Sequence, residues 1–201
     1  MKIIGIGKNY HQPNQPRDDQ RQDPIIFTKP TSSIAGGSVF NYPDCSNDVH
    51  YELEIVLKIN QLIKNRPAKA CVNVFDEIAL GLDWTAKDLQ QTAKSKGLPW
   101  FFAKGFDEAT FLSEWIDATY FSDLKNLNLT FLVNGEKRIS GNTKEMILSY
   151  GQIISHVSRF MTLEPGDLIM TGTPHTPGPI HRGDQCEGLI NGERFLHFNV
   201  I

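Results

Sequence analysis

Two glutamates separated by a single residue are the first side chains in this sequence whose types and spacing could do chemistry. Glu52 and Glu54 lie in the segment 50–59, in which leucine or isoleucine occupies every second position from residue 53 to residue 59. This alternation predicts a strand with one apolar face, and the two carboxylates share the opposite face, roughly 7 Å apart. A divalent cation, which prefers carboxylate oxygens, would offset their mutual repulsion. A strand face exposed to water explains the pair equally well.

A third carboxylate favours the metal site. Asp83 interrupts the apolar segment 78–84, and a carboxylate in such a segment is usually paired or metal-bound because burying it alone is costly. Two other roles are open to Asp83, namely capping the following helix or pairing with a lysine. We assign the cap to Thr85, since Asp88 three residues later completes a variant of the capping box. Glu52, Glu54 and Asp83 are the predicted ligands, and on an octahedral Mg²⁺ they leave about three positions for a two-oxygen substrate and a water.

Basic and amide side chains follow Asp83 at helical spacing. Lys87, Gln90 and Lys94 share one stripe of the helix predicted over residues 86–96, so part of this stripe could face the carboxylates. Solvation of Lys87 and Lys94 is the simpler alternative, as for most lysines on helices. Lys104 lies among aromatic and small residues, which is unusual for a lysine, although a side chain that extends to solvent would also explain it.

The elements that must position these residues are mostly strands. Strands are predicted over residues 2–7, 25–28, 74–83 and 168–171, and a hairpin over 129–133 and 137–140 around the turn Asn134-Gly135. Helices are predicted over residues 67–73, 86–96 with its end at Gly97, and 144–161 with a break near Gly151. The polar, proline-containing segment 11–24 is predicted to be a mobile loop that could act as a lid. The expected fold class is α+β, predominantly β.

The composition is that of an ordinary globular protein and argues against some functions. The 201 residues are 40% hydrophobic and 21% charged, and we interpret them as one domain spanning residues 1–201. A net charge of −3 argues against a general nucleic-acid surface, and no apolar run approaches the ~20 residues of a membrane helix. The three cysteines are scattered, which suits a reducing cytosol without disulfides, so a cytoplasmic location is expected.

Eight short motifs, taken in order, resemble the fumarylacetoacetate hydrolase family, in particular its short acylpyruvate hydrolase and oxaloacetate decarboxylase branch. They are GKNY at 7–10, FTKP at 27–30, HYELE at 50–54, LDWTAKDLQ at 82–90, KGLPW at 96–100, AKGF at 103–106, LEPGD at 163–167 and TGTP at 171–174. No single motif is decisive, but the ordered set covers essentially the whole chain. The resemblance implies a rolled mixed sheet flanked by a few helices, and usually a homodimer.

The same resemblance assigns roles to individual residues. It places Mg²⁺ or Mn²⁺ on the three carboxylates already singled out, Lys104 and Gln90 near the substrate, and the loop around Thr173 over the site. Three carboxylates and Mg²⁺ sum to about −1, which would repel an anionic substrate unless a lysine offset it. Lys8 and Lys87 stand where similar proteins often have arginine, so they would bind a substrate carboxylate without the bidentate geometry of arginine.

The sequence departs from the family in the lid. Active hydrolases of the family carry a histidine and a glutamate three residues apart, and Pro13 and Pro16 occupy those positions here. The prolines would also disrupt a lid helix. His11 is a candidate base if the loop folds over the site, although a single loop histidine is more often only solvated.

The resemblance implies metal-dependent cleavage of a C–C bond in a small β-dicarbonyl acid such as an acylpyruvate or oxaloacetate. Hydrolysis needs a base to activate water, whereas decarboxylation needs only an electron sink, so loss of the lid pair weakens hydrolysis more. Two alternatives belong to other classes. One is a catalytically impaired protein that binds metal and keto acids, and the other is a structural β-domain without metal.

Overall fold

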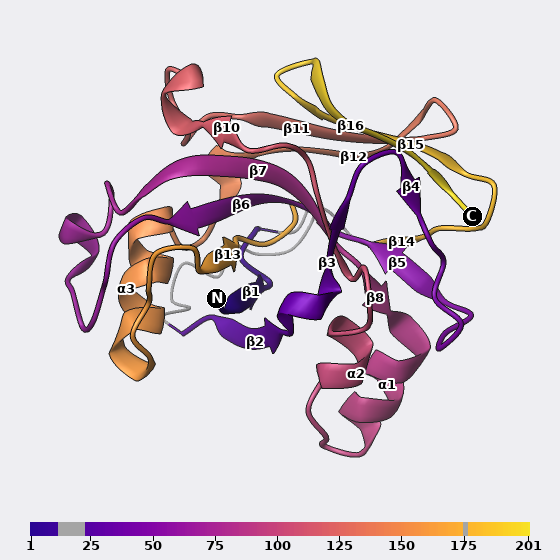
Figure 1. The fold of residues 1–201 in the computed structure, drawn as a ribbon, viewed down its shortest axis with the longest axis horizontal. Coiled ribbons are helices and arrows are strands. Elements are labelled where there is room, and N and C mark those ends of the chain that lie inside the picture. The colour runs from indigo at the N-terminus through magenta and orange to yellow at the C-terminus, as the bar shows by residue number, and fades with distance from the viewer. Residues whose placement is uncertain (12–22, 175–176) are drawn as a thin grey trace.

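A curled mixed sheet of eight strands forms the centre of the structure, a computed structural model that describes residues 1–11, 23–174 and 177–201 (Figure 1). Seven strands follow one another in the order β2-β1-β13-β6-β7-β9-β3, and β10 pairs with β7. Their bounds are Ile3–Gly7 (β1), Ile25–Lys29 (β2), Ile34–Gly36 (β3), Leu53–Ile59 (β6), Phe75–Asp83 (β7), Thr110–Leu112 (β9), Ile116–Asp117 (β10) and Leu168–Met170 (β13). The pairs β1–β13 and β3–β9 are parallel and the others are antiparallel.

A second sheet packs over β6 and β7. Its five strands have the order β12-β11-β15-β16-β4, and β11 contacts β6 while β15 contacts β7 (Figure 1). A small third sheet has the order β14-β5-β8. The bounds are Val39–Phe40 (β4), Val49–Tyr51 (β5), Thr85–Ala86 (β8), Asn128–Val133 (β11), Glu136–Asn142 (β12), Gly178–Pro179 (β14), Gln185–Ile190 (β15) and Glu193–Val200 (β16). The predicted class, α+β and predominantly β with a rolled mixed sheet, is confirmed.

The alternation predicted for segment 50–59 is confirmed, and it separates two cores. The apolar face of β6 (Leu53, Ile55, Leu57 and Ile59) is buried in the main core with side chains of the five-stranded sheet. Val56 points the other way, into a small cluster inside the curl that also includes side chains of β1, β7, β9 and β13. A slip of one residue would turn the whole apolar face away from the main core and Glu54 and Lys58 into it, which would bury charged groups among apolar side chains. Burial therefore determines the face on which Glu54 lies.

Three α-helices border the sheets in the described part of the chain, together with four short 3₁₀ turns. They are α1 (Lys87–Ser95), α2 (Phe101–Lys104) and α3 (Tyr150–Phe160), and the turns cover Thr31–Ser33, Ala68–Ala70, Ala118–Tyr120 and Thr143–Glu145. The predicted helix over 86–96 is confirmed as α1, and its end at Gly97 has the left-handed φ of 64° that favours glycine. The predicted hairpin around Asn134-Gly135 is confirmed as β11 and β12.

Three local predictions are wrong. Thr85 does not cap α1, because its hydroxyl donates to Glu52 Oε1 (3.2 Å) and the N-cap residue is Ala86 without a side-chain bond. Within residues 67–73 only Ala68–Ala70 form a 3₁₀ turn, and Pro67 before it has an extended backbone with a ψ of 149°. The helix expected from residue 144 begins at Tyr150 and continues through Gly151 without a break. The amide of Ser149 donates to Gln152 Oε1 (2.9 Å), which starts α3 there.

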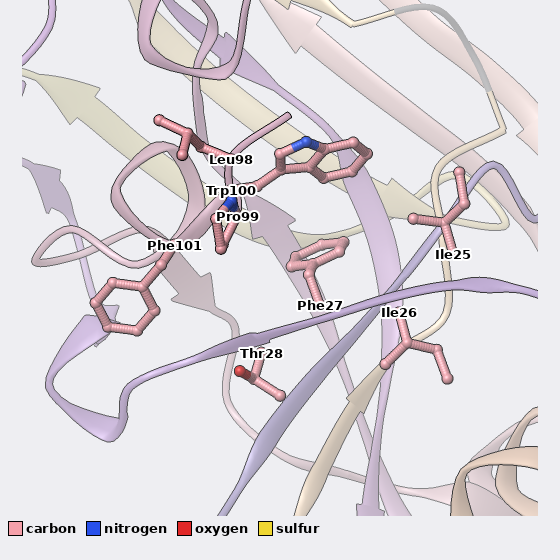
Figure 2. A pocket seen from close by; sticks show the side chains of 8 residues that line it. All are labelled: Ile25, Ile26, Phe27, Thr28, Leu98, Pro99, Trp100 and Phe101. Atoms are coloured by element: carbon pink, nitrogen blue, oxygen red, sulfur yellow. The ribbon is translucent and has the colours of Figure 1, made fainter. Parts of the chain in front are cut away.

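The segment that joins α1 to α2 lies against β2. Leu98 to Phe101 and Ile25 to Thr28 line a cavity of about 380 Å³ between them, with the rings of Phe27 and Trp100 side by side (Figure 2). The ring centroids are 6.3 Å apart. This packing fixes α2, and with it Lys104, next to β2.

Candidate metal centre

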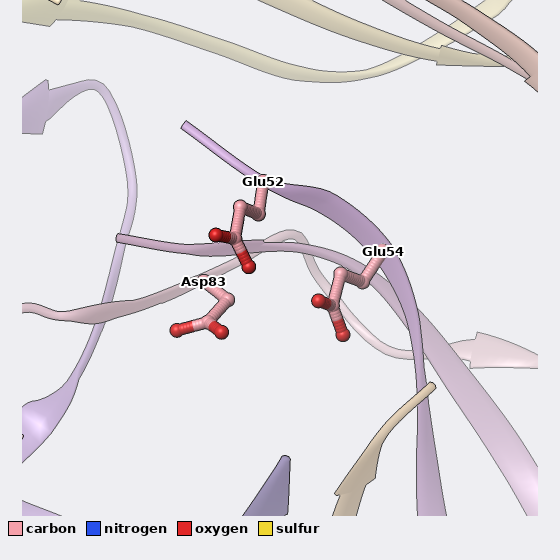
Figure 3. Close-up of side chains that lie close together, drawn as sticks. All are labelled: Glu52, Glu54 and Asp83. Atoms are coloured by element: carbon pink, nitrogen blue, oxygen red, sulfur yellow. The ribbon is translucent and has the colours of Figure 1, made fainter. Parts of the chain in front are cut away.

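The pairing of β6 with β7 brings the three predicted carboxylates together. Leu53 lies opposite Leu82, and one residue further the amide of Asp83 donates to the carbonyl of Glu52 (2.9 Å). Residues that lie opposite each other on paired strands project to the same face, and Glu54 joins them two residues along β6. One oxygen from each carboxylate lies within 4.8 Å of the others, and the three groups point toward one space (Figure 3).

Two of these carboxylates are almost completely buried. Glu54 is 2% exposed and Asp83 is 0% exposed, so the alternative of a water-exposed strand face is wrong. Burial raises the pKa of Glu54 well above its ordinary value, and the charges of Asp83 and Glu52 raise it further, against a hydrogen bond from the Gly172 amide. Such a group ionises readily only beside a new positive charge, which is what a metal ion would supply.

Two buried lysines form ion pairs with the carboxylate cluster. Lys104, at the end of α2, donates to Glu52 Oε2 (2.9 Å) and Asp83 Oδ2 (2.6 Å), and it is only 2% exposed. Lys29, at the end of β2, donates to Asp83 Oδ1 and to the carbonyl of Ala109. Burial alone would raise the pKa of Asp83, but Lys104 and Lys29 together hold it below its ordinary value. Lys104 therefore does not extend to solvent, and Asp83 pairs with lysine as well as facing the other carboxylates.

Lys29 changes the charge balance that the sequence suggested. With all five groups ionised, as metal binding would require, three carboxylates and two ammonium groups carry one net negative charge, and a divalent cation would turn this into one positive charge. A keto acid carries the matching negative charge on its carboxylate. Sequence reasoning missed Lys29, because a lysine that ends a short strand before a proline is usually solvated. One signal was present, since strand alternation places Lys29 on the same face as Phe27.

The loop after β13 closes the cluster from the side of Glu54. The amide of Gly172 donates to Glu54 Oε2 (2.8 Å), and Gly172 has a φ of 98°, a left-handed value that favours glycine. Asn9 supports this loop, because its Nδ2 donates to the carbonyl of Thr171 (3.0 Å). The buried hydroxyl of Thr173 has no hydrogen-bond partner among the described residues. Thr173 thus offers an unused polar group one residue after Gly172. Its role as a substrate contact stays a prediction.

The α1 stripe also faces this side of the molecule. Gln90 is buried, and its Oε1 accepts from Lys87 Nζ (3.3 Å) and Lys94 Nζ (3.2 Å). Burial lowers the pKa of Lys94, and the nearby charges of Lys87 and Lys8 lower it further. Lys94 is exposed and Lys87 is half-buried, so the expected solvation holds for Lys94, while both ammonium groups also donate to one amide oxygen.

The residues present fit a hard divalent cation. All three candidate ligands are carboxylates, and each carboxylate oxygen has a second lone pair besides the one used by Lys29, Lys104, Thr85 or Gly172. Oxygen-only ligand sets are those that Mg²⁺ and Mn²⁺ prefer. Glu52, Glu54 and Asp83 would hold the ion.

The predicted lid is only partly described. Pro13 and Pro16, and most of segment 11–24, lie outside the described residues. The backbone of His11 is anchored to the turn before α3, where its amide donates to the carbonyl of Glu145 (3.3 Å). Lys8 has a left-handed φ of 58° beside Asn9. The role of His11 as a lid base stays a prediction.

This fold and this acidic site place the chain in a known class. It belongs to the fumarylacetoacetate hydrolase C-terminal family, whose sequence model matches residues 2–198. The chain is 37% identical over 201 residues to the mitochondrial oxaloacetate tautomerase of Arabidopsis thaliana, covering 99% of this chain and 90% of that protein. It is 35% identical over 204 residues to the mitochondrial oxaloacetate decarboxylase of Dictyostelium discoideum, covering 100% of this chain and 94% of the relative.

A solved structure agrees with the fold. The crystal structure of fumarylpyruvate hydrolase from Pseudomonas aeruginosa in complex with Mn²⁺ and pyruvate superposes with a TM-score of 0.92 at 29% identity. The superposition covers 100% of this chain and 89% of that one. Among the helices that the structure describes, none has the length and apolar character needed to cross a membrane.

Proposed function

We propose that this chain is a divalent-metal-dependent enzyme that breaks a C–C bond of small β-dicarbonyl acids, with oxaloacetate as the first candidate substrate. The observation that carries the proposal is the buried cluster of Glu52, Glu54 and Asp83, which two lysines contact through ion pairs. Its lone negative charge suits one Mg²⁺ or Mn²⁺ together with one anionic substrate. A bound cation would supply Lewis-acid polarisation of the keto acid's carbonyl.

The protein's own residues would orient the substrate and stabilise the charge on it. Burial would lower the pKa of Lys104, but Asp83 and Glu52 raise it above its ordinary value, so Lys104 stays a cation and acts as a fixed charge rather than as a base. The Thr173 hydroxyl and the Gln90 amide are polar groups that can position the substrate. Lys29 likewise acts as a fixed positive charge, and it favours the ionised form of Asp83.

Decarboxylation suits this site better than hydrolysis. In oxaloacetate the bond between C3 and the distal carboxylate carbon breaks, CO₂ leaves, and the electron pair stays on C3 in conjugation with the C2 carbonyl. A proton from water then gives pyruvate. No base is needed for this step, whereas hydrolysis of an acylpyruvate requires one. The names of the relatives, an oxaloacetate tautomerase and an oxaloacetate decarboxylase, favour the same substrate.

Two other functions keep specific support. Hydrolysis of an acylpyruvate is favoured by the likeness to a fumarylpyruvate hydrolase, with His11 as the candidate base. A binding protein without turnover is favoured by the prolines at the lid positions. We further propose that the chain acts as a homodimer, as the resemblance implies. A cytoplasmic location stays a prediction, since several relatives are named as mitochondrial.

The test follows the ultraviolet enol absorbance of oxaloacetate and of a short acylpyruvate, with Mg²⁺ or Mn²⁺ and with chelator, while a coupled assay measures pyruvate. We expect metal-dependent consumption of oxaloacetate, and its loss in Glu52→Ala. The exposed Glu114 is the matched control, since its carboxylate makes no contact with the cluster, so Glu114→Ala should keep the wild-type rate.

The outcomes separate the candidates. Metal-dependent consumption of acylpyruvate as well would support hydrolysis and a replacement base. Stabilisation by a keto acid and metal without consumption would support the binding protein. Full turnover and metal affinity in Glu52→Ala would contradict the assignment of the site.

A further inference from the structure

One peptide group in the loop after β13 carries the hydrogen bond to Glu54. The Gly172 N–H donates to Glu54 Oε2 (2.8 Å), and it is the only hydrogen-bond donor to this carboxylate among the residues that the structure describes. Glu52 and Asp83 differ in this respect, because lysine or threonine side chains donate to both of them. The orientation of Glu54 therefore depends on how this one peptide group is held.

Asn9 holds the opposite side of the same peptide group. Its Nδ2 donates to the carbonyl oxygen of Thr171 (3.0 Å), and that carbonyl shares a peptide bond with the Gly172 N–H. A trans peptide unit is planar, and its carbonyl and N–H point in opposite directions. The two hydrogen bonds therefore form a chain from Asn9 through the peptide group to Glu54. Donation to the carbonyl also polarises the N–H, which strengthens its bond to the carboxylate.

Without Asn9, little in the described part of the chain would stop this peptide group from rotating. The amide and the hydroxyl of Thr171 both donate to the carbonyl of Ile55 on β6 (3.1 and 2.8 Å), but these two bonds hold the residue on the side that precedes the peptide group. On the other side, Gly172 has no Cβ to restrict rotation. Asn9 is the only hydrogen-bond donor to the Thr171 carbonyl among the described residues.

The side chain of Asn9 is itself held firmly. It is buried, its Nδ2 also donates to the carbonyl of Leu148 (3.1 Å), and its Oδ1 accepts from the amide of the same residue (2.9 Å). The main-chain carbonyl of Asn9 accepts from the Ile147 amide (2.7 Å). Leu148 thus fixes which way the Asn9 amide faces, and both N–H groups of that amide are in use.

We propose that Asn9 is a positioning residue of the metal centre. It holds the peptide group between Thr171 and Gly172 so that Glu54 presents its carboxylate to the ion, and it thereby raises the affinity for the metal. Asn9 acts through this peptide group, since it makes no hydrogen bond to any of the three carboxylates. The inference rests on the proposed function, because it takes Glu54 as a ligand of the ion.

The test compares Asn9→Ala, and the milder Asn9→Ser, with the matched control Asn142→Ala. Asn142 is also buried, and its amide is used in the same way. Its Nδ2 donates to two oxygens, Asn126 Oδ1 (2.9 Å) and Asn128 Oδ1 (2.8 Å), and its Oδ1 accepts from the Lys144 amide (2.9 Å). None of these partners belongs to the carboxylate cluster, so the control reports the loss of a buried amide alone.

Three properties of the full chain are measured. Calorimetry gives the affinity for Mn²⁺, and thermal unfolding in chelator gives the stability. Nuclear magnetic resonance of the metal-free chain gives the chemical shift of the Gly172 amide proton, which is identified by its absence in Gly172→Ala. This shift reports the hydrogen bond to Glu54 directly, so a role of Asn9 in stability alone would not move it.

We expect Asn9→Ala and Asn142→Ala both to unfold at a lower temperature than the wild type. Only the Asn9 variants should lose affinity for Mn²⁺, by about ten- to a hundredfold, the range typical of residues that support metal ligands. The Gly172 amide proton should shift upfield in Asn9→Ala, because its bond to Glu54 weakens, and stay in place in Asn142→Ala.

The results that would overturn the inference differ from those that would overturn the proposed function. Wild-type affinity for Mn²⁺ in Asn9→Ala, or an equal loss in Asn142→Ala, would overturn the role of Asn9 and leave the proposed function standing. Absence of Mn²⁺ binding by the wild type would contradict the proposed function. An unchanged Gly172 shift in Asn9→Ala would overturn the role of Asn9 in either case.

Discussion

At the scale of single residues, the centre depends on a balance of buried charges. Asp83 is completely buried and receives hydrogen bonds from two lysines, one on each carboxylate oxygen. Removing one partner of a buried charge costs much more than removing a surface ion pair, because the remaining charge stays away from water. The two lysines therefore support the metal site even before a metal binds.

Lys29→Met tests this balance. We expect the free energy of unfolding in chelator to fall by about 3 kcal/mol, because the Asp83 carboxylate would keep only Lys104 as a partner. Denaturant unfolding would measure the change. Lys69→Met is the matched control, since Lys69 is exposed and makes no contact with the site, and it should change stability by less than about 0.5 kcal/mol. Equal stability of the two variants would contradict the structural role of Lys29.

At the scale of elements, the loop after β13 positions Glu54 through a single backbone amide. Gly172 makes this contact at a φ of 98°, and a Cβ built there would lie 3.0 Å from Asn9 Cβ and 3.1 Å from the carbonyl oxygen of Ile6. Gly37 has the same φ of 98° with nothing within 4 Å of a built Cβ. The two glycines therefore share the conformational requirement but differ in packing.

We predict that Gly172→Ala destabilises the fold more than Gly37→Ala does and also weakens metal binding. Gly37→Ala should cost roughly 1–2 kcal/mol, the price of a left-handed alanine. Gly172→Ala should cost more, because the loop must shift and the hydrogen bond to Glu54 is lost. Unfolding curves and Mn²⁺ titrations of both variants provide the measurement. Metal affinity that falls equally in both would show that the loop does not position Glu54.

Local patterns predicted the elements that depend on local physics. The alternation from Leu53 to Ile59 identified β6, and Asn134-Gly135 identified the hairpin, because burial and turn geometry act within a few residues. The start of α3 was missed, since the helix begins at Tyr150, six residues after the predicted start, where Ser149 and Gln152 cap it. Lys29 was missed for another reason. Its partners, Asp83 and Ala109, come from distant segments, and a lysine on its own is usually solvated.

At the scale of the whole molecule, the site joins segments that are far apart in the chain. Strand β1 pairs in parallel with β13, which places residues 3–5 beside residues 168–170. The three carboxylates were predicted from their own neighbours in sequence. The family resemblance implied only in part that β2, α2 and the loop after β13 cover the carboxylates. Such long-range pairing cannot be read from local periodicity, because periodicity states which face is buried but not which strand will cover it.

Because the three carboxylates lie together in one buried site, the stability of the molecule should depend on metal and pH together. The folded pKa of Glu54 is raised by burial and by Asp83 and Glu52, so the metal-free fold retains a proton that the unfolded chain releases. Its contribution to stability is therefore complete below the ordinary pKa of a glutamate and is lost as the pH rises through the raised value. Metal binding requires the ionised carboxylate, so its stabilising effect grows over the same interval.

We predict that Mg²⁺ raises the melting temperature more at about pH 8 than at about pH 5.5, with about 2.7 kcal/mol of stabilisation when Mg²⁺ is at 100 times its dissociation constant. Thermal unfolding with Mg²⁺ or chelator across this range measures the effect. Glu54→Gln removes the titrating group and should flatten the pH dependence of whatever Mg²⁺ effect remains. A Mg²⁺ effect that is independent of pH in the wild type, or larger in acid, would mean that Glu54 does not bind the ion as a carboxylate.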